Sequence, residues 1–233
     1  MVSPPRQLTI ALQAATQYGD DVKEYAFSID PTFAFLPGQY VTLRFPGEKR
    51  YHAFSIASST NERGTLRLLI KAVGEFTKRL FNAPLGSTLE LLGPLGTFTI
   101  PADENEVVMI GGGVGVAPFL GVVRTACDAK LTRKCTLFYS CRQCVEIACK
   151  DELDELPAKS ANVAVVVTLT RETPQGWAGE LGRVDASMLQ RRLGSLDGKT
   201  FYLCGPEAMV AGVRESLKGA GVPAARVRFE AWG

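Results

Sequence analysis

The first hundred residues consist of short apolar segments separated by turn-forming residues. The segments are rich in β-branched and aromatic residues, which favour strands, and pairs such as Pro37-Gly38, Pro46-Gly47 and Gly93-Pro94 mark turns between them. Strands are predicted over Leu8–Thr16, Val22–Ile29, Tyr40–Phe45, Phe54–Ala57, Leu66–Val73, Leu89–Leu92 and Phe98–Ile100. Strands at this spacing favour a small antiparallel β-barrel, interrupted by one short helix at about Thr77–Phe81.

The pattern changes after residue 102, where continuous apolar runs alternate with helical periodicity. Uninterrupted apolar runs are typical of parallel strands that are buried on both faces. Strands are predicted over Val107–Ile110, Thr136–Tyr139, Val163–Leu169, Thr200–Leu203 and Val227–Phe229. Helices are predicted up to about Ala129, over Glu146–Leu156 and Ala186–Leu193, and from about Glu207 to Lys218. This alternation indicates an α/β doubly wound domain with a parallel sheet, so we expect two domains, 1–102 and 103–233.

Charge and composition exclude several classes of protein. The chain has 26 basic and 24 acidic residues and a formal charge of +2, which gives no reason to expect nucleic-acid binding. A single histidine, His52, excludes a multi-histidine metal site. Glycines and Pro118 interrupt the longest uncharged stretch, 107–123, so no membrane insertion is expected. The N-terminus has no signal-peptide pattern, which favours a cytoplasmic protein with reduced cysteines.

Two glycine-containing turns follow predicted strands and open helices. The first is Ile110–Pro118, which includes Gly112, Gly113, Val114 and Gly115, and the second is Tyr202–Met209, which includes Cys204, Gly205 and Pro206. Glycines at such a place let the backbone approach a pyrophosphate at the helix N-terminus. Turns at the carboxyl ends of neighbouring parallel strands frame one crevice. The alternatives are a tight turn without a ligand, and Cys204 as a small buried side chain.

Ten segments in order along the chain carry a resemblance to a known family. They are 38–41, 52–59, 71–77, 93–98, 111–118, 139–142, 150–153, 177–184, 204–206 and 229–232. Over nearly its whole length the sequence resembles the ferredoxin-NADP reductase superfamily, in which an FAD-binding barrel precedes a nicotinamide-nucleotide domain. The resemblance implies bound FAD, NAD(P)H as the electron donor, hydride transfer from nicotinamide C4 to flavin N5, and release of electrons to a separate acceptor.

On the flavin side, the resemblance implies roles for the segment His52-Ala53-Phe54-Ser55. The family motif is Arg-x-Tyr/Phe-Ser/Thr, in which the arginine pairs with the flavin pyrophosphate, the aromatic ring lies against the isoalloxazine and the hydroxyl bonds near N5. His52 replaces the arginine, and Arg50 is expected to supply the missing charge. The alternative for His52 is a neutral side chain bonded within the barrel. Gly74-Glu75-Phe76-Thr77 matches the family's Gly-x-x-Ser/Thr phosphate loop, with an ordinary N-cap as the alternative. Further flavin-lining candidates are Tyr40, Ile56, Ala57, Lys71, Ala72 and Val73.

On the nucleotide side, the resemblance assigns the pyrophosphate to the first glycine turn and the nicotinamide to Cys204, with Gly205, Pro206 and Met209 beside it. Ser140 and Arg142 stand where relatives read the ribose end. Arg142 fits a 2′-phosphate, but NADH-using relatives also have an arginine there, so the choice between NADH and NADPH stays open. Glu230 resembles the glutamate that assists proton supply, and Trp232 the aromatic that covers the flavin. The alternative is a final strand that buries Phe229 and Trp232 in the core.

Four of the six cysteines, Cys135, Cys141, Cys144 and Cys149, lie within fifteen residues. An iron–sulfur or zinc site is conceivable at this spacing, but Cys135 leads into a core strand, and we expect thiols and no metal. Cys141 and Cys144 are expected to be the exposed, oxidisable pair.

The residues leave more than one function open. The main expectation is a reductase, monomeric or weakly oligomeric, that passes electrons to ferredoxin, flavodoxin, a cytochrome, an oxygenase component or a small acceptor. One alternative is a flavin reductase that uses free flavin as a substrate. The other is an electron-transfer subunit of a larger redox complex.

Overall fold

A computed structural model of the protein describes residues 4–101 and 103–232, without the side chain of Trp232. By their contacts the residues form two compact units. One contains the residues up to Ile100 together with Ala117–Ala129, and the other contains Pro101–Val116 together with the residues from Lys130 onward. The predicted domains 1–102 and 103–233 differ from these units mainly in the helix at 117–129, and that boundary stays a prediction.

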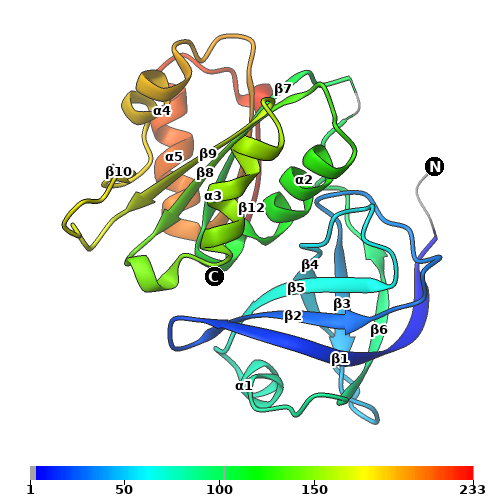
Figure 1. The fold of residues 1–233 in the computed structure, drawn as a ribbon. Coiled ribbons are helices and arrows are strands. Elements are labelled where there is room, and N and C mark those ends of the chain that lie inside the picture. Colours follow the sequence, from blue (N-terminus) through cyan, green and yellow to red (C-terminus); the bar gives the residue numbers. More distant parts are fainter. Residues whose placement is uncertain (1–3, 102, 233) are drawn as a thin grey trace. The chain divides into compact units, whose positions relative to one another are not determined.

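The first unit is built on an antiparallel, nearly closed six-stranded barrel (Figure 1). Its strands are β1 (Arg6–Tyr18), β2 (Val22–Ser28), β3 (Tyr40–Arg44), β4 (His52–Ser55), β5 (Thr65–Lys71) and β6 (Thr88–Leu95), in the order β4-β3-β6-β1-β2-β5. A single bridge between Ile56 and Leu68 joins the two ends of the sheet. Alternate residues, such as Tyr25 and Phe27 of β2, fill the interior. Helix α1 (Glu75–Phe81) and helix α2 (Ala117–Asp128) also belong to this unit.

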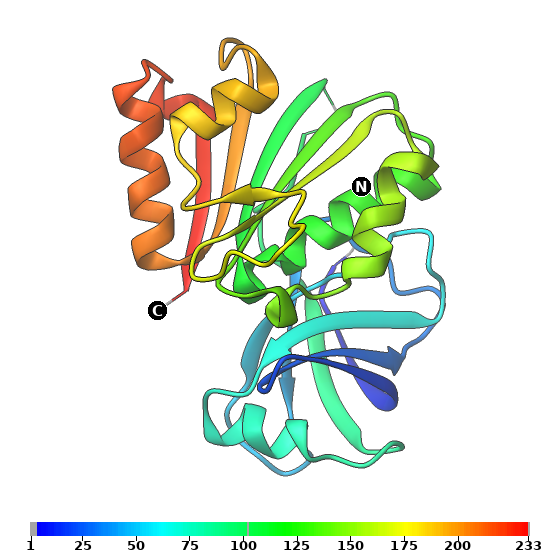
Figure 2. The same ribbon diagram turned by 60° about the vertical axis from the view of Figure 1, so that its left-hand side comes forward.

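The second unit contains a six-stranded parallel sheet (Figures 1 and 2). Its strands are β7 (Glu106–Gly112), β8 (Lys134–Cys141), β9 (Val163–Leu169), β10 (Glu180–Leu181), β11 (Thr200–Pro206) and β12 (Val227–Trp232). Short 3₁₀ helices lie at Gly113–Val116, Cys144–Glu146 and Ala224–Arg226. Helices α4 (Ala186–Leu193) and α5 (Glu207–Gly219) pack on one face of the sheet, and α3 (Lys150–Lys159) lies on the other.

The strand order β10-β9-β8-β7-β11-β12 places a topological switch between β7 and β11. From β7 the chain builds the sheet outward through β8 and β9, and then it returns to the other side of β7 at β11. In open α/β sheets, ligands bind outside the carboxyl ends of the strands at such a point. The predicted fold class, an antiparallel barrel followed by a doubly wound parallel sheet, is confirmed.

Several predicted elements differ from the structure. Phe98–Ile100 is not a strand, because the chain turns at Gly96, where φ is +92°, and the Phe98 ring packs 6.1 Å from that of Phe119. The helix predicted to begin at Glu146 begins at Lys150, since Cys149 adopts a left-handed φ of +55°. The short helix begins at Glu75, two residues earlier than predicted, with Gly74 as its N-cap residue. The short strand β10 was not predicted.

Among the described helices, none is long and apolar enough to cross a membrane.

We expect Tyr25→Phe to stabilise the barrel. The Tyr25 hydroxyl is buried and, within the described residues, has no hydrogen-bond partner, and burial raises its pKa to about 12. A buried polar group without a partner costs about 1–3 kcal/mol, which phenylalanine removes without changing the packed ring. The midpoint of thermal unfolding should therefore rise by a few degrees. A lower midpoint would mean that the hydroxyl has a partner, such as a buried water.

Candidate functional site

Strand β4 brings the predicted flavin residues together in the barrel unit. The ring of His52 stacks on that of Phe76, with centroids 4.3 Å apart and planes 16° apart, and the ring of Phe54 lies 5.9 Å from Phe76. His52 and Phe54 alternate with exposed Ala53 along the strand, so both reach the same aromatic side chain. Ser55 ends β4 half-buried, opposite Tyr40 of β3.

The environment of His52 disfavours its charged form. Partial burial and the positive charge of Arg50 lower the pKa of His52, against a smaller opposite effect of Glu48. His52 is therefore neutral at pH 7, and it does not replace the charge of the family's arginine. Arg50 is exposed and close enough to act on His52 electrostatically, which fits the predicted replacement cation.

We expect His52→Arg to tighten flavin binding about tenfold or more. A guanidinium can stack on Phe76 and donate charge-assisted hydrogen bonds, each contributing about 1.5–3 kcal/mol, to a flavin phosphate. His52→Gln, which stays neutral, is the matched control and should not tighten binding. The measurement is the flavin retained after dilution and gel filtration, and equal retention by wild type and His52→Arg would contradict the expectation.

The predicted phosphate loop has a closed and an open side. The hydroxyl oxygen of Thr77 accepts hydrogen bonds from the backbone N–H groups of Val73 and Gly74, both at 2.9 Å, and the hydroxyl lies 3.1 Å from the Gly74 carbonyl, to which it donates. Thr77 is buried and thus serves as a structural cap of the loop. On the other side, a Cβ at Gly74 would meet nothing within 4 Å. The open backbone at Gly74 and the cation at Arg50 fit a flavin phosphate, and the binding role of this loop stays a prediction.

Most of the further flavin candidates already make contacts within the fold. The side chains of Ile56 and Ala57 are buried, and their N–H groups donate to the carbonyls of Gln39 and Arg67. Lys71 forms an ion pair of 3.2 Å with Asp21, and Ala72 donates to the Asp21 carbonyl. Val73 is 68% exposed, and the Tyr40 ring packs against Gly96. Their contact with a flavin stays a prediction.

In the second unit, the two predicted turns lie side by side at the switch point. Strands β7 and β11 are neighbours, and Cys204 is paired in register with Gly111. A Cβ at Gly115 would lie 2.5 Å from Gly205 Cα and would also collide with the Cys204 carbonyl. A Cβ at Gly112 would collide with the sulfur of Met209. Gly115 is therefore required for the packing of one turn on the other, because it meets backbone atoms, whereas Gly112 packs against the flexible Met209 side chain.

Gly113 differs from these two glycines. It is exposed with φ +53°, a Cβ there would meet nothing within 4 Å, and Val114 beside it is half-buried. The open surface of the first turn is thus at Gly113, directly beyond the carboxyl end of β7. This opening fits a pyrophosphate that approaches the backbone, so the turns suit a dinucleotide.

The terminal strand places Glu230 beside Cys204. The two residues are paired in register between β11 and β12, Cys204 is fully buried, and burial raises the pKa of Glu230. The alternative of Cys204 as a buried side chain fits its burial, but the residue also stands at the switch point. Trp232 is paired through its backbone with Pro206, and its predicted role falls on a side chain outside the described residues. Phe229 is 43% exposed, so it is not a core residue.

Arg142, which is predicted to read the ribose, is paired with the carboxylate of Glu146, a partner that the sequence analysis did not identify. Ser140 is the next-to-last residue of β8 and pairs with Gly112, and Arg142 is the first residue after the strand. The Arg142 guanidinium donates to Glu146 at 2.5 and 3.2 Å, and the Arg142 N–H donates to the same carboxylate at 3.1 Å. Burial opposes ionisation of Glu146, but the hydrogen bonds from Arg142 outweigh it and lower the pKa. The four-residue spacing of opposite charges was the available signal.

The prediction that Cys141 is exposed was wrong. Cys141 is the last residue of β8 and is 3% exposed, and burial raises its pKa to about 12. Cys144 is partly exposed, as predicted. All six cysteines lie in the described part of the chain, and they form no disulfide. Within that part, no three His, Cys, Asp or Glu side chains form a group that could hold a metal ion.

Comparison with known families identifies both halves. Residues 9–100 match the oxidoreductase FAD-binding domain, and residues 109–215 match the oxidoreductase NAD-binding domain. The chain belongs to the ferredoxin-NADP reductase superfamily. As a member of this superfamily it has the domains for FAD and for a nicotinamide nucleotide, in the order expected from its sequence.

Two curated members of this superfamily and one solved structure are similar to the chain. It is 30% identical to the reductase component of propane 2-monooxygenase from Rhodococcus jostii, over 85% of this chain and 55% of that protein. It is 31% identical to the reductase subunit of aromatic O-demethylase from Amycolatopsis, over 91% and 65%. The structure of the Amycolatopsis cytochrome P450 reductase GcoB matches with a TM-score of 0.86 and 28% identity, over 98% and 70%. The chain thus spans about half to two thirds of the length of these two curated relatives.

Proposed function

We propose that this chain is an FAD-dependent NAD(P)H oxidoreductase that passes electrons to a separate acceptor, such as the oxygenase component of a multicomponent system. The observation that carries the proposal is the pair of turns at the β7–β11 switch point in a chain whose residues 9–100 match the FAD-binding domain. The similar proteins named as reductase components and subunits support the choice of acceptor.

In this function the residues orient the cofactors and supply protons. When bound, FAD accepts a hydride from the reduced nicotinamide and can release the electrons singly. Ser55 presents a hydroxyl at the end of β4, and Arg50 and the Gly74 loop hold the flavin phosphates. Gly113 admits the nucleotide pyrophosphate, and Cys204 lies beside the nicotinamide. Glu230, whose pKa is raised by burial, is paired in register with Cys204 and is the residue that would assist proton supply.

The test is a visible spectrum of the purified protein, chromatographic identification of the released flavin, and anaerobic addition of NADH or NADPH. Near-stoichiometric FAD that is bleached by the nucleotide is expected. A colourless protein that oxidises NAD(P)H only with added flavin would instead indicate a free-flavin reductase. Turnover only with co-purified subunits would indicate a subunit of a larger complex.

We further propose that NADH is the preferred donor. The carboxylate of Glu146 already neutralises Arg142, so a 2′-phosphate at this place would meet a negative charge. A ribose 2′-hydroxyl can donate to the same carboxylate without repulsion. This arrangement favours NADH over NADPH.

Glu146→Gln is expected to raise kcat/KM for NADPH relative to NADH by about tenfold, because it frees the Arg142 charge for the phosphate. Glu155→Gln on α3 is the matched control, since Glu155 forms a similar four-residue ion pair with Lys159 away from the turn. Steady-state kinetics with both nucleotides measures the ratio. An unchanged ratio in Glu146→Gln would contradict the role of this pair.

A further inference from the structure

Helix α2 follows the nucleotide turn in the chain but packs with the barrel. Its first residue, Ala117, comes directly after the 3₁₀ turn Gly113–Val116, and the matched NAD-binding domain includes the whole helix. By its contacts, however, Ala117–Ala129 belongs to the same compact unit as the barrel strands. The helix therefore connects the predicted pyrophosphate turn to the flavin-binding unit.

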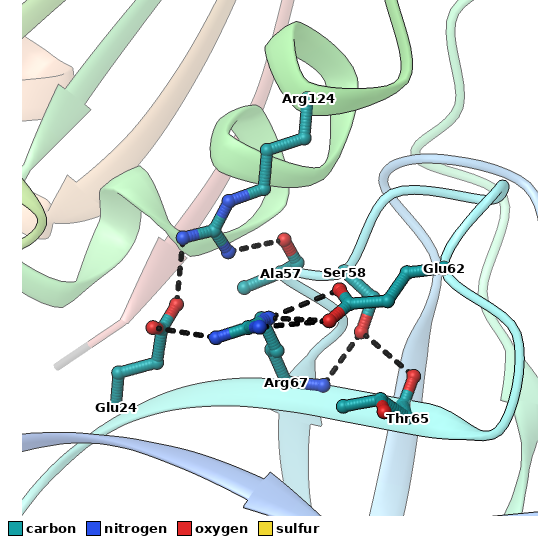
Figure 3. Close-up of polar contacts among 7 residues, drawn as sticks. All are labelled: Glu24, Ala57, Ser58, Glu62, Thr65, Arg67 and Arg124. Carbon is teal, nitrogen blue, oxygen red and sulfur yellow. Dashed lines mark hydrogen bonds and ion pairs between the residues drawn. The ribbon is translucent and has the colours of Figure 1, made fainter. Parts of the chain in front are cut away.

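A buried arginine fixes α2 to the barrel (Figure 3). The Arg124 side chain is 7% exposed, and it donates to the Ala57 carbonyl at 2.7 Å and pairs with the Glu24 carboxylate at 2.8 Å. Glu24 is itself buried on β2, 8% exposed, and its second oxygen lies 3.5 Å from Arg67. The Arg124 guanidinium thus bonds to both a carboxylate and a backbone carbonyl inside the barrel unit.

Two neighbouring positions on α2 contact the same segment of the barrel. The Thr125 hydroxyl accepts a hydrogen bond of 3.0 Å from the Thr60 N–H. A Cβ at Gly121 would lie 2.9 Å from the Ile56 carbonyl oxygen and 3.1 Å from that of Ser58. Residues 121, 124 and 125 share one face of a helix. This face lies directly on residues 56–60.

Residues 56–60 begin immediately after Ser55, which ends β4 and is the predicted hydroxyl at flavin N5. Along the chain, α2 therefore begins at the predicted pyrophosphate turn, and the segment on which it packs begins next to Ser55. A helix of this length is rigid over about 18 Å, so a shift of α2 on the segment moves the turn as well. Hydride transfer depends on the distance and alignment of the reacting atoms, and a misplacement of about 1 Å slows such reactions strongly.

The Arg124–Glu24 ion pair is better suited to fixing the position of α2 than to adding stability. A buried ion pair often adds little to stability compared with apolar residues of the same volume, because both charges lose their hydration. The planar guanidinium, in contrast, fixes direction, since its donors meet two acceptors in a set geometry. Arg124 meets one acceptor on β2 and one on the segment after β4.

We propose that Arg124 is a positioning residue for hydride transfer. Arg124 holds α2, the helix that directly follows the nucleotide turn in the chain, on the Ala57 carbonyl, two residues after Ser55. This inference rests on the proposed function, and it concerns the rate of flavin reduction rather than the binding of either cofactor.

The test compares Arg124→Met/Glu24→Gln with wild type as FAD-loaded proteins, with anaerobic rapid mixing against NADH and against NADH carrying deuterium at the transferred position. The double substitution avoids an unpaired buried carboxylate. We expect full flavin content, a Kd for NADH within about threefold of wild type, and a limiting rate of flavin reduction at least tenfold lower, with a deuterium effect that shows the hydride step itself is slowed. Arg124→Lys, a point charge without the planar fork, should give an intermediate rate.

Arg67→Met is the matched control. Arg67 belongs to the same network, but its guanidinium bonds are to Glu62 and Glu24 on the barrel (Figure 3), so its loss should leave the limiting rate unchanged. A limiting rate within twofold of wild type in the double variant, or a change in NADH affinity alone, would overturn the proposal. Failure of both Arg124 variants to fold would also overturn it, because Arg124 would then be purely structural. A wild-type protein that NADH does not reduce would instead refute the proposed function.

Discussion

Gly115→Ala is expected to raise KM for NAD(P)H at least tenfold while leaving bound flavin in place. The methyl group would lie 2.5 Å from Gly205 Cα and would collide with the Cys204 carbonyl, and both are backbone atoms that cannot rotate away. The two turns must then separate, which costs about 1–3 kcal/mol and moves the open backbone at Gly113. Titration of the FAD-loaded protein with NADH, together with thermal unfolding, measures both effects.

The matched control for this variant is Gly212→Ala. Gly212 is an exposed position of α5 where a Cβ would meet nothing within 4 Å. Alanine there should stabilise the helix by up to about 1 kcal/mol and leave nucleotide binding unchanged. Wild-type affinity in Gly115→Ala would show that the two turns can separate without disturbing the nucleotide site.

Phe76→Ala is expected to destabilise the protein by about 3–5 kcal/mol and to release the flavin. Phe76 is 6% exposed, and its ring lies 4.3 Å from that of His52, 5.2 Å from Phe45 and 5.9 Å from Phe54. Removing the ring leaves a cavity beside β4, the strand that is predicted to bind the flavin. It also removes packing at the start of α1, directly after the Gly74 loop. Denaturant unfolding and flavin content after gel filtration are the measurements.

Two further variants serve as controls for Phe76→Ala. Phe76→Leu keeps most of the buried volume and should cost less than Phe76→Ala while retaining flavin. Leu85→Ala removes a side chain that is 65% exposed in the turn before β6, and it should change stability by no more than about 0.5 kcal/mol. Flavin loss without destabilisation in Phe76→Ala would mean that Phe76 contacts the cofactor itself rather than supporting β4.

Regular elements were predictable where local pattern and burial agree. The strand at Val163–Leu169 and the helix at Ala186–Leu193 have the predicted bounds, because each has a clear period and a clear stop. Prediction failed at Phe98–Ile100 and at the start of α3. There the course of the chain depends on a positive φ at Gly96 or Cys149 and on packing against distant residues such as Phe119.

The residues of the candidate site were predictable from the sequence, but the role of each residue within the site was not. Gly112, Gly113 and Gly115 look alike in sequence, yet two of them pack against the second turn and only Gly113 is open. Arg142 reads as a free cation in sequence, whereas the loop folds Glu146 back onto it. Such assignments depend on which backbone atoms approach within a few ångströms, and a linear sequence does not contain that information.

The sequence by itself determined the two-part architecture, the order of the cofactor domains and the identity of both turns, because strand and helix periods, glycines and motif order are local properties. Only the tertiary structure decided that α2 packs with the barrel and that Arg124, Glu24 and the Ala57 carbonyl meet there. These groups come from three distant parts of the chain. In the unfolded chain these groups are far apart, and water weakens the attraction between their charges. Folding brings them together and excludes water, which strengthens the attraction.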